Sequence, residues 1–345
     1  MPALLFFDDV CYDLAGNMFK QKRFWLGLII SLVLLTFVFY QTDPVKIWSS
    51  LQRAQYLYLI PGLALYFLGV GVRAVRWRFL LRSIKPIPSR ALFRTVVIGY
   101  MANDILPARM GEIVRAYILG AQENVSKAAT LVTIVVERIF DGLTMLLFIV
   151  VASLLLNFAD EELTARLRLV ALLFIAAIAG LAILAGMPKL AERLAEFCLS
   201  RLPSASWRER ALRLTRSLLD GLGVLRSPAD SFAVFALSVL AWLCETAMYG
   251  VIAWGFNLVL PFAVFLLACA FANLVTIAHS TPGYIGVFDA PVVYVLTLFG
   301  VEQNLAASYT LILHAALVMP VTLLGFYYLG RAGLSLGQMA RASHA

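Results

Sequence analysis

The sequence predicts an all-α polytopic membrane protein with about six full transmembrane helices and two re-entrant helical hairpins that enter from opposite sides. Three observations lead to this fold class. The chain of 345 residues is 62% hydrophobic and 14% charged, whereas soluble domains carry roughly 25% charged residues. Proline, glycine and charged residues interrupt two apolar segments, 91–120 and 261–299. With these two segments as hairpins, the most basic loops all fall on the cytoplasmic side of the membrane, as the positive-inside rule requires.

The first part of the chain supplies two spans and a basic segment. Phe24–Tyr40 and Tyr56–Val72 are apolar runs long enough to cross a bilayer. No cleavage site follows the first run, so we interpret it as a retained span. Residues 73–90 hold six Lys or Arg side chains and no acid, with Trp77 and Leu80 at helical spacing. This pattern predicts a basic amphipathic helix on the cytoplasmic membrane surface.

Residues 91–120 are predicted to form the first hairpin. The apolar run Ala91–Ala102 is too short to cross a bilayer before charged residues begin. Pro107 removes a backbone donor and Gly111 loosens the helix, so the chain is expected to break here. Broken backbone at membrane depth persists only inside protein or beside a wet cavity. Charges at such a break therefore indicate a buried polar site.

The loop 187–230 decides between a hairpin and a full span at 91–120. It holds eight basic and five acidic residues, a net charge of +3, and is predicted to carry two amphipathic surface helices. A hairpin leaves this loop in the cytoplasm, as the positive-inside rule requires, whereas a full span would move it outside. The sequence therefore predicts a multi-pass membrane protein, a single transmembrane domain over 1–345, with both termini cytoplasmic.

Four further spans and the second hairpin complete the predicted fold. The spans are expected within 127–158, 167–186, 231–256 and 306–329. The second hairpin, 261–299, breaks at Thr281–Gly286 and enters from outside. In each hairpin an asparagine, Asn103 or Asn273, precedes the proline and glycine of the break. Interrupted segments at matching places in two halves suggest an inverted repeat around a central site.

Three sequence stretches together resemble one known family. They are Asn103-x-x-Leu106-Pro107-x-Arg109-x-Gly111-Glu112-x-x-Arg115, Glu137-Arg138-x-x-Asp141-Gly142-Leu143 and Pro282-Gly283-x-x-Gly286-x-Phe288-Asp289. The chain is similar, over about 20–335, to the flippase-like, lysylphosphatidylglycerol-synthase transmembrane-domain family. That family includes the membrane half of multiple peptide resistance factors and stand-alone relatives. In the third stretch Tyr284 replaces a usual glycine and Asp289 a usual glutamate.

The resemblance implies an inner-membrane protein that moves or accommodates a lipid with a polar headgroup. In fused relatives a separate soluble domain transfers an amino acid from charged tRNA to phosphatidylglycerol. The chain ends at Ala345, soon after the last predicted span. We therefore expect no soluble aminoacyltransferase domain.

The charged residues of the first two stretches are candidates for a headgroup site. Arg109 and Arg115 would bind a lipid phosphate, and Glu112 would offer a counter-charge to a cationic or hydroxylated headgroup. The alternative is an ion pair that only closes the hairpin. The second stretch puts three charges within one turn, and these either pair with the first hairpin, which we favour, or form a proton relay or an isolated cluster. The candidate headgroup-binding residues are Asn103, Asp104, Pro107, Arg109, Gly111, Glu112, Arg115, Glu137, Arg138, Asp141, Pro282, Gly283, Gly286 and Asp289.

Other polar residues and motifs add little to this set. Glu245 and His279 are candidates for proton coupling, whereas His314 is expected to be a packed polar contact. The sequence contains no familiar catalytic, nucleotide-binding or zinc motif. We therefore expect neither an enzyme nor a cofactor, a metal or a nucleic-acid partner.

The leading hypothesis is a lipid flippase or transporter that moves a polar-headgroup lipid. The lipid could be a phospholipid derivative, a glycolipid or a polyprenyl-linked lipid. The alternative is a non-transporting membrane subunit, or an enzyme, of a lipid or cell-envelope biosynthesis complex. In that case a separate lipid- or glycan-modifying enzyme is the expected partner.

Overall fold

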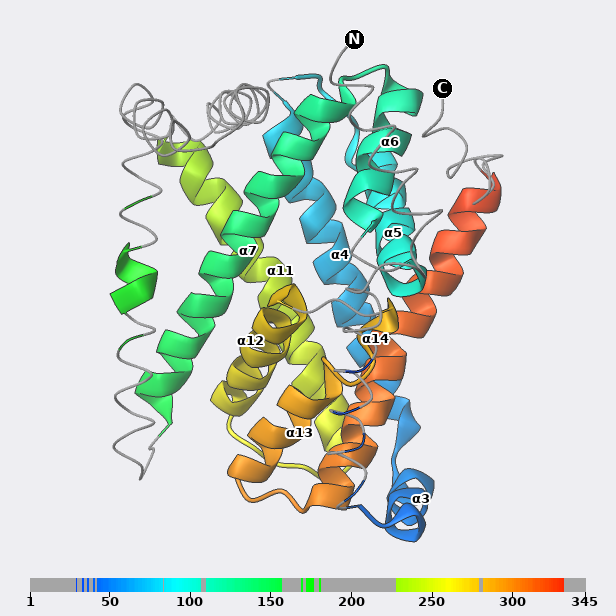
Figure 1. The fold of residues 1–345 in the computed structure, drawn as a ribbon, viewed down its shortest axis with the longest axis vertical. Coiled ribbons are helices and arrows are strands. Elements are labelled where there is room, and N and C mark those ends of the chain that lie inside the picture. Colours follow the sequence, from blue (N-terminus) through cyan, green and yellow to red (C-terminus); the bar gives the residue numbers. More distant parts are fainter. Residues whose placement is uncertain are drawn as a thin grey trace.

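The computed structural model describes residues 42–82, 84–106, 110–156, 228–278 and 282–331, with isolated positions within 29–40 and 169–180. Within these ranges the chain forms helices joined by turns, and no strand occurs among them (Figure 1). Several predicted features lie outside the described residues: the span 24–40, most of the span 167–186, the loop up to residue 227, Pro107, Arg109 and His279.

The first half of the described chain is a long helix, a broken helix pair and a second long helix. Its elements after the short helix α3 (Pro44–Arg53) are α4 (Leu59–Leu81), α5 (Ser89–Ile105), α6 (Gly111–Glu123) and α7 (Lys127–Leu155). A left-handed residue, Asn124, ends α6 with φ of 53°, a conformation that asparagine tolerates. Ser126 then caps α7 by accepting a hydrogen bond from the backbone N–H of Ala129.

The basic segment 73–90 is not a surface helix, so this prediction is wrong. α4 covers the first part of this segment and ends at Leu81, so it extends well beyond the predicted span Tyr56–Val72. Arg73 and Arg76 are only 3% and 0% exposed, and Trp77 is fully buried beside them. The physical reason is that these arginines meet carboxylates on α7 and on a helix of the second half, which the local sequence does not show.

The second half repeats the same succession. Its elements are α11 (Pro228–Gly255), α12 (Phe262–Ala278), the 3-10 turn η4 (Pro282–Tyr284), α13 (Asp289–Leu298) and α14 (Gln303–Arg331). The chain between α12 and α13 turns through left-handed backbone at Gly283, Tyr284 and Gly286, whose φ angles are 63°, 55° and 78°. Tyrosine adopts this region at a cost of about 1–2 kcal/mol.

The two halves run in opposite directions. In Figure 1, α4 rises from the lower to the upper end of the molecule, and α11 descends beside it. The pair α5–α6 starts at the upper end and turns back at mid-height, whereas the pair α12–α13 starts at the lower end and turns back at mid-height. The long helices α7 and α14 are likewise antiparallel. This arrangement has the form of the inverted repeat that the sequence suggests.

Three described helices are long and apolar enough to cross a membrane: Tyr56–Leu81, Ala229–Gly255 and Gln303–Arg331. Phe262–Ile277 and Asp289–Leu298 are shorter apolar helices. At 1.5 Å per residue, the 29 residues of α7 extend roughly 43 Å. Charged residues interrupt the apolar character of α7 in its first half.

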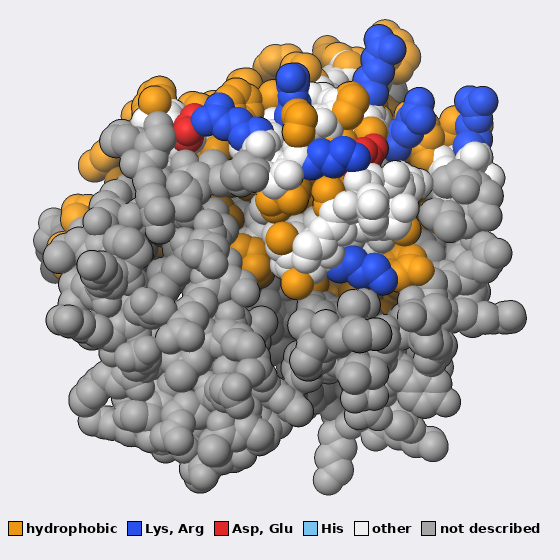
Figure 2. Space-filling view, turned by 90° about the horizontal axis from the view of Figure 1, so that it is seen from above, with side chains coloured by type: hydrophobic (Ala, Val, Ile, Leu, Met, Phe, Trp, Pro, Cys, Tyr) orange, Lys and Arg blue, Asp and Glu red, His pale blue; other side chains and the backbone are white. Residues whose placement is uncertain are grey.

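Basic side chains gather at the upper end of the molecule (Figure 2). Those on the described residues of this end are Arg78, Arg82, Lys85, Arg90, Arg94, Lys127 and Arg331. Two acids accompany them, Asp230 at 2.5 Å from Arg82 and Glu123 at 3.0 Å from Lys85. At the lower end, the described residues carry two basic side chains, Lys46 and Arg53, and two acidic ones, Asp43 and Glu302, so their charges cancel. Among the described residues, the excess positive charge therefore lies at the upper end.

Candidate functional site

The first hairpin turns where Asn103 meets Gly111. The backbone N–H of Gly111, at the start of α6, donates a hydrogen bond to Asn103 Oδ1 at 2.7 Å, which satisfies one of the free donors of a helix N-terminus. The helices touch at this point, because a Cβ on Gly111 would lie 2.0 Å from the carbonyl oxygen of Gly99. Asn103 and Gly111, predicted to bind a headgroup, therefore first of all shape the hairpin.

The second hairpin is closed in a comparable way by Asp289. Its Oδ2 accepts a hydrogen bond from the backbone N–H of Gly286 at 2.7 Å, just before α13 begins. Gly283 and Gly286 supply the left-handed backbone of the turn. Pro282 begins the turn and contributes its backbone. The candidate residues of the third sequence stretch thus build the tip of this hairpin.

The two tips meet at mid-height (Figure 1). A Cβ on Gly283 would lie 3.6 Å from the carbonyl oxygen of Asp104, so the end of α5 touches the turn η4. Asp104 Oδ2 also accepts a hydrogen bond from Thr322 Oγ1 of α14 at 2.7 Å. Between the tips and the long helices lies a cavity of about 130 Å³. Both hairpins line it, the first through Tyr100, Asn103, Asp104 and Glu112, the second through Asn273, Thr276, Tyr284 and Phe288.

Charged side chains line this central cavity, and they are unequally paired. Arg73 Nη2 lies 2.8 Å from Glu245 Oε2, and the Arg73 guanidinium stacks on the ring of Trp242 at 4.3 Å. Arg138 Nη2 lies 3.4 Å from Asp141 Oδ2, an i,i+3 pair as predicted. Glu112 Oε2 is buried and has no hydrogen-bond partner among the residues that the structure describes. A buried acceptor without a partner costs free energy, so Glu112 is the residue of this cavity best prepared to receive a donor.

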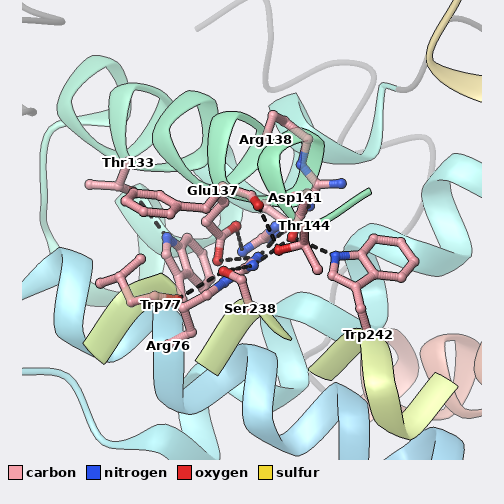
Figure 3. Close-up of polar contacts among 12 residues, drawn as sticks. Arg76, Trp77, Thr133, Glu137, Arg138, Asp141, Thr144, Ser238 and Trp242 are labelled. Atoms are coloured by element: carbon pink, nitrogen blue, oxygen red, sulfur yellow. Dashed lines mark hydrogen bonds and ion pairs between the residues drawn. The ribbon is translucent and has the colours of Figure 1, made fainter. Parts of the chain in front are cut away.

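Next to the cavity, Arg76 of α4 neutralises the carboxylates of Glu137 and Asp141 on α7 (Figure 3). Arg76 Nη1 donates to Asp141 Oδ1 at 2.5 Å and to Ser238 Oγ at 2.7 Å. Its Nη2 lies 3.5 Å from Glu137 Oε1. Trp242 Nε1 donates to the same Asp141 oxygen at 2.8 Å. Asp141 is therefore saturated by partners from α4, α7 and α11.

Arg115 joins the first hairpin to this network. Its Nη2 lies 2.9 Å from Glu137 Oε2, and its guanidinium stacks on Trp77 at 4.1 Å. Trp77 in turn donates from Nε1 to Thr133 Oγ1 at 3.0 Å. The prediction that the charges of α7 pair with the first hairpin is confirmed for Glu137, whereas Asp141 pairs with Arg76 of α4 and Arg138 of α7.

The structure divides the predicted site residues into three groups. Those that line the central cavity are Asn103, Asp104, Glu112, Arg138 and Glu245. Those that shape the hairpin tips are Gly111, Pro282, Gly283, Gly286 and Asp289. Those that form the buried ion network are Arg115, Glu137 and Asp141. Arg115 is 3% exposed and already paired, so the structure assigns it a structural contact in place of the predicted phosphate contact.

Sequence reasoning missed several residues that the cavity and network need. Arg73, Arg76 and Trp242 fall in this class, as does Thr322. One signal was present: Arg73 and Arg76 continue an apolar helix without a break, and charges inside a span are expensive unless they pair.

Comparison with known proteins gives a family match over most of the chain. Residues 24–325 match the family described as "Lysylphosphatidylglycerol synthase TM region". A UPF0104 membrane protein of Methanothermobacter thermautotrophicus is 25% identical over 319 residues, which cover 89% of this chain and 92% of that protein. A second one from the same organism is 22% identical over 299 residues, 83% and 88% of the two chains.

A further relative shares only part of its length. Glycosyltransferase AglD of Haloferax volcanii is 30% identical over 121 residues, 34% of this chain and 19% of that protein. No solved structure matches the chain significantly. The family match and the apolar helices together identify a membrane protein. The chain belongs to the lysylphosphatidylglycerol synthase transmembrane-region family.

Proposed function

We propose that this protein is a lipid transporter of the flippase type that moves a lipid with a polar headgroup across the inner membrane. The observation that carries the proposal is the charged cavity of about 130 Å³ where two opposed hairpins meet. Polar and ionisable groups at membrane depth are expensive unless they serve a pathway or pair with one another. Within the described part of the chain, the buried Oε2 of Glu112 has no hydrogen-bond partner, which supports a role in binding.

In this proposal the upper end of the molecule faces the cytoplasm. Its excess of Lys and Arg side chains, seen in Figure 2, supports that orientation by the positive-inside rule. The pair α5–α6 is then a re-entrant hairpin from the cytoplasm and α12–α13 one from outside. Together with the spans expected outside the described residues, this gives six crossings and cytoplasmic termini.

The charges that line the cavity favour a headgroup with hydrogen-bond donors. Arg73 is paired with Glu245, and Asp104 is held by one hydrogen bond from Thr322. The carboxylates of Glu112 and Asp104 can accept from an amine or hydroxyl of the headgroup. Arg138, whose side chain is 33% exposed, would contact the lipid phosphate in the place first assigned to Arg115.

Transport in reconstituted liposomes tests this proposal. A lipid with a fluorescent label on one acyl chain and a free headgroup is placed in both leaflets. Half of it is protected from an impermeant quencher, and transport removes the protection. We expect the wild-type protein to expose labelled aminophospholipid or glycolipid, and Glu112→Gln to slow exposure on the order of tenfold, since one hydrogen bond to a charged group contributes about 1.5 kcal/mol or more. The matched control is Glu123→Gln on the same helix, which changes a surface pair with Lys85. Equal rates for wild type and Glu112→Gln would remove the site.

A second candidate function is a non-transporting subunit beside an enzyme that modifies lipid or glycan headgroups. One observation favours it, namely the partial match to a protein named as a glycosyltransferase. In that case purified protein would leave every labelled lipid protected, and a separate modifying enzyme would copurify with it from native membranes.

A further inference from the structure

His314 joins α14 to the tip of the second hairpin. Its Nε2 lies 2.7 Å from the carbonyl oxygen of Gly283, and its Nδ1 lies 2.7 Å from Asp289 Oδ1. Both side chains of the pair are 13% exposed. Asp289 Oδ2 already accepts from the backbone N–H of Gly286. A single imidazole thus holds the start of the turn and the first residue of α13 at once.

The two contacts fix how many protons the pair carries. A carbonyl oxygen can only accept, so Nε2 must carry a proton and donate it to Gly283. Nδ1 faces a carboxylate, so a second proton lies between Nδ1 and Asp289 Oδ1, whichever atom holds it. The pair is then electrically neutral. When that second proton leaves to water, the pair carries one net negative charge, and the imidazole has one N–H left for two acceptors.

No other charged group among the described residues around His314 balances the negative charge that appears when this proton leaves. From α5, Asp104 acts on His314 electrostatically. α11 and α4 bring Glu245 and Arg73, which are paired with each other at 2.8 Å. α3 carries Lys46 and Arg53 at the lower end of the molecule. Against α13, the partner of His314 is Asp289 itself.

The turn held by His314 separates two cavities. Tyr284 and Phe288 line the charged central cavity, whereas Gly283, Asp289 and His314 line a second, mostly apolar cavity of about 410 Å³ between α13 and α14. Val318 lines both. A displacement of the turn away from α14 would therefore join the charged cavity to the apolar one.

We propose that His314 and Asp289 form a one-proton latch that closes the second hairpin against α14 and opens it when the proton is lost. The latch itself does not depend on whether the protein transports a lipid. It rests on the proposed function only in its consequence, since an opened turn would let a headgroup in the central cavity continue beside acyl chains in the apolar one. Transport would then be coupled to proton binding at His314 and Asp289, and not at Glu245 or His279.

The motion of the turn as a function of pH tests the latch without any transport. Ile285, which is 52% exposed, is replaced by a spin-labelled cysteine in a Cys11→Ser/Cys198→Ser background, in lipid nanodiscs. The native Cys244 and Cys269 are buried and stay in place. We expect low label mobility at acid pH and a rise to high mobility over about two pH units, the width of a one-proton transition. No transition between pH 5 and pH 9 would overturn the proposal.

Variants locate the proton. His314→Gln can still donate to the Gly283 carbonyl but cannot titrate, and Asp289→Asn removes the carboxylate. Each is expected to abolish the transition, provided that the protein stays monodisperse. His279→Gln is the control that should keep the transition, and loss of the transition in this variant alone would place the proton at His279 instead. Transport without a mobility transition rejects the latch alone, whereas a transition without transport rejects the proposed function alone.

Discussion

Arg115 Nη2 on α6 lies 2.9 Å from Glu137 Oε2 on α7, and this buried pair fastens the first hairpin to the long helix behind it. The Arg115 guanidinium is also stacked on Trp77 at 4.1 Å. The pair is part of a continuous network, because Glu137 also faces Arg76 and Arg76 reaches Asp141. The network keeps the carboxylates of α7 neutralised at the level where the hairpins turn.

The first prediction concerns the stability that this pair provides. Arg115→Ala should lower the free energy of unfolding by about 3–5 kcal/mol, because it leaves a buried carboxylate short of a partner. Lys85→Ala breaks a surface pair, 44% and 25% exposed, and should cost about 0–1 kcal/mol. Thermal melting in detergent compares the two variants. Similar losses for both would contradict a structural role for Arg115.

The second prediction concerns the close approach of α5 and α6. Gly111→Ala should prevent the hairpin from closing, since the new Cβ would lie 2.0 Å from the Gly99 carbonyl oxygen and 2.5 Å from Asn103 Oδ1. Gly142→Ala in α7 is the control, because nothing lies within 4 Å of its Cβ position. That change should be neutral or stabilise the helix by up to about 1 kcal/mol. Yield of monodisperse protein and melting temperature distinguish the outcomes.

The third prediction concerns the Arg73–Glu245 pair at the cavity wall. Arg73→Met and Glu245→Met should each destabilise the protein by about 3–5 kcal/mol, because each strands one buried charge. The double variant should lose less than the sum of the single losses, with a coupling energy of about 0.5–3 kcal/mol. Unfolding free energies of the four proteins give this value. Additive losses would mean that the two residues do not stabilise each other.

The fourth prediction concerns orientation. A cysteine that replaces Arg90, at the basic upper end, should react with an impermeant maleimide only after the membrane is opened. A cysteine that replaces Lys46, in α3 at the lower end, should react in intact spheroplasts. Both positions are exposed. The reverse labelling pattern would invert the proposed topology and with it the sides from which the hairpins enter.

The positions of the two breaks could be predicted because their signals are local. Gly111 opens α6, and Pro282 and Gly283 form the turn before α13. Proline removes a donor and glycine permits left-handed backbone wherever they stand. Charges next to these residues then mark the interruption of an apolar run. No knowledge of neighbouring helices is needed for such an inference.

The partners of the charged residues could not be predicted in the same way. Arg76 meets Asp141 across 65 residues of chain, and Arg73 meets Glu245 across 172. The basic segment around them contains no acid, so its composition favoured a membrane surface. His314 was expected to be a packed polar contact, and its partners could not be named because Gly283 and Asp289 belong to the second hairpin whereas His314 belongs to α14.

The sequence by itself determined that the chain is helical, belongs in a membrane and breaks twice beside charged residues. Composition, proline and glycine act through the backbone of their own segment, so these features follow from residue order alone. Only the tertiary structure decided that Arg115 pairs with Glu137, that Glu112 Oε2 lacks a hydrogen-bond partner among the described residues, and that His314 holds the second turn. Electrostatic and hydrogen-bond energies depend on distance in space, and these distances are set by how antiparallel helices from the two halves pack together.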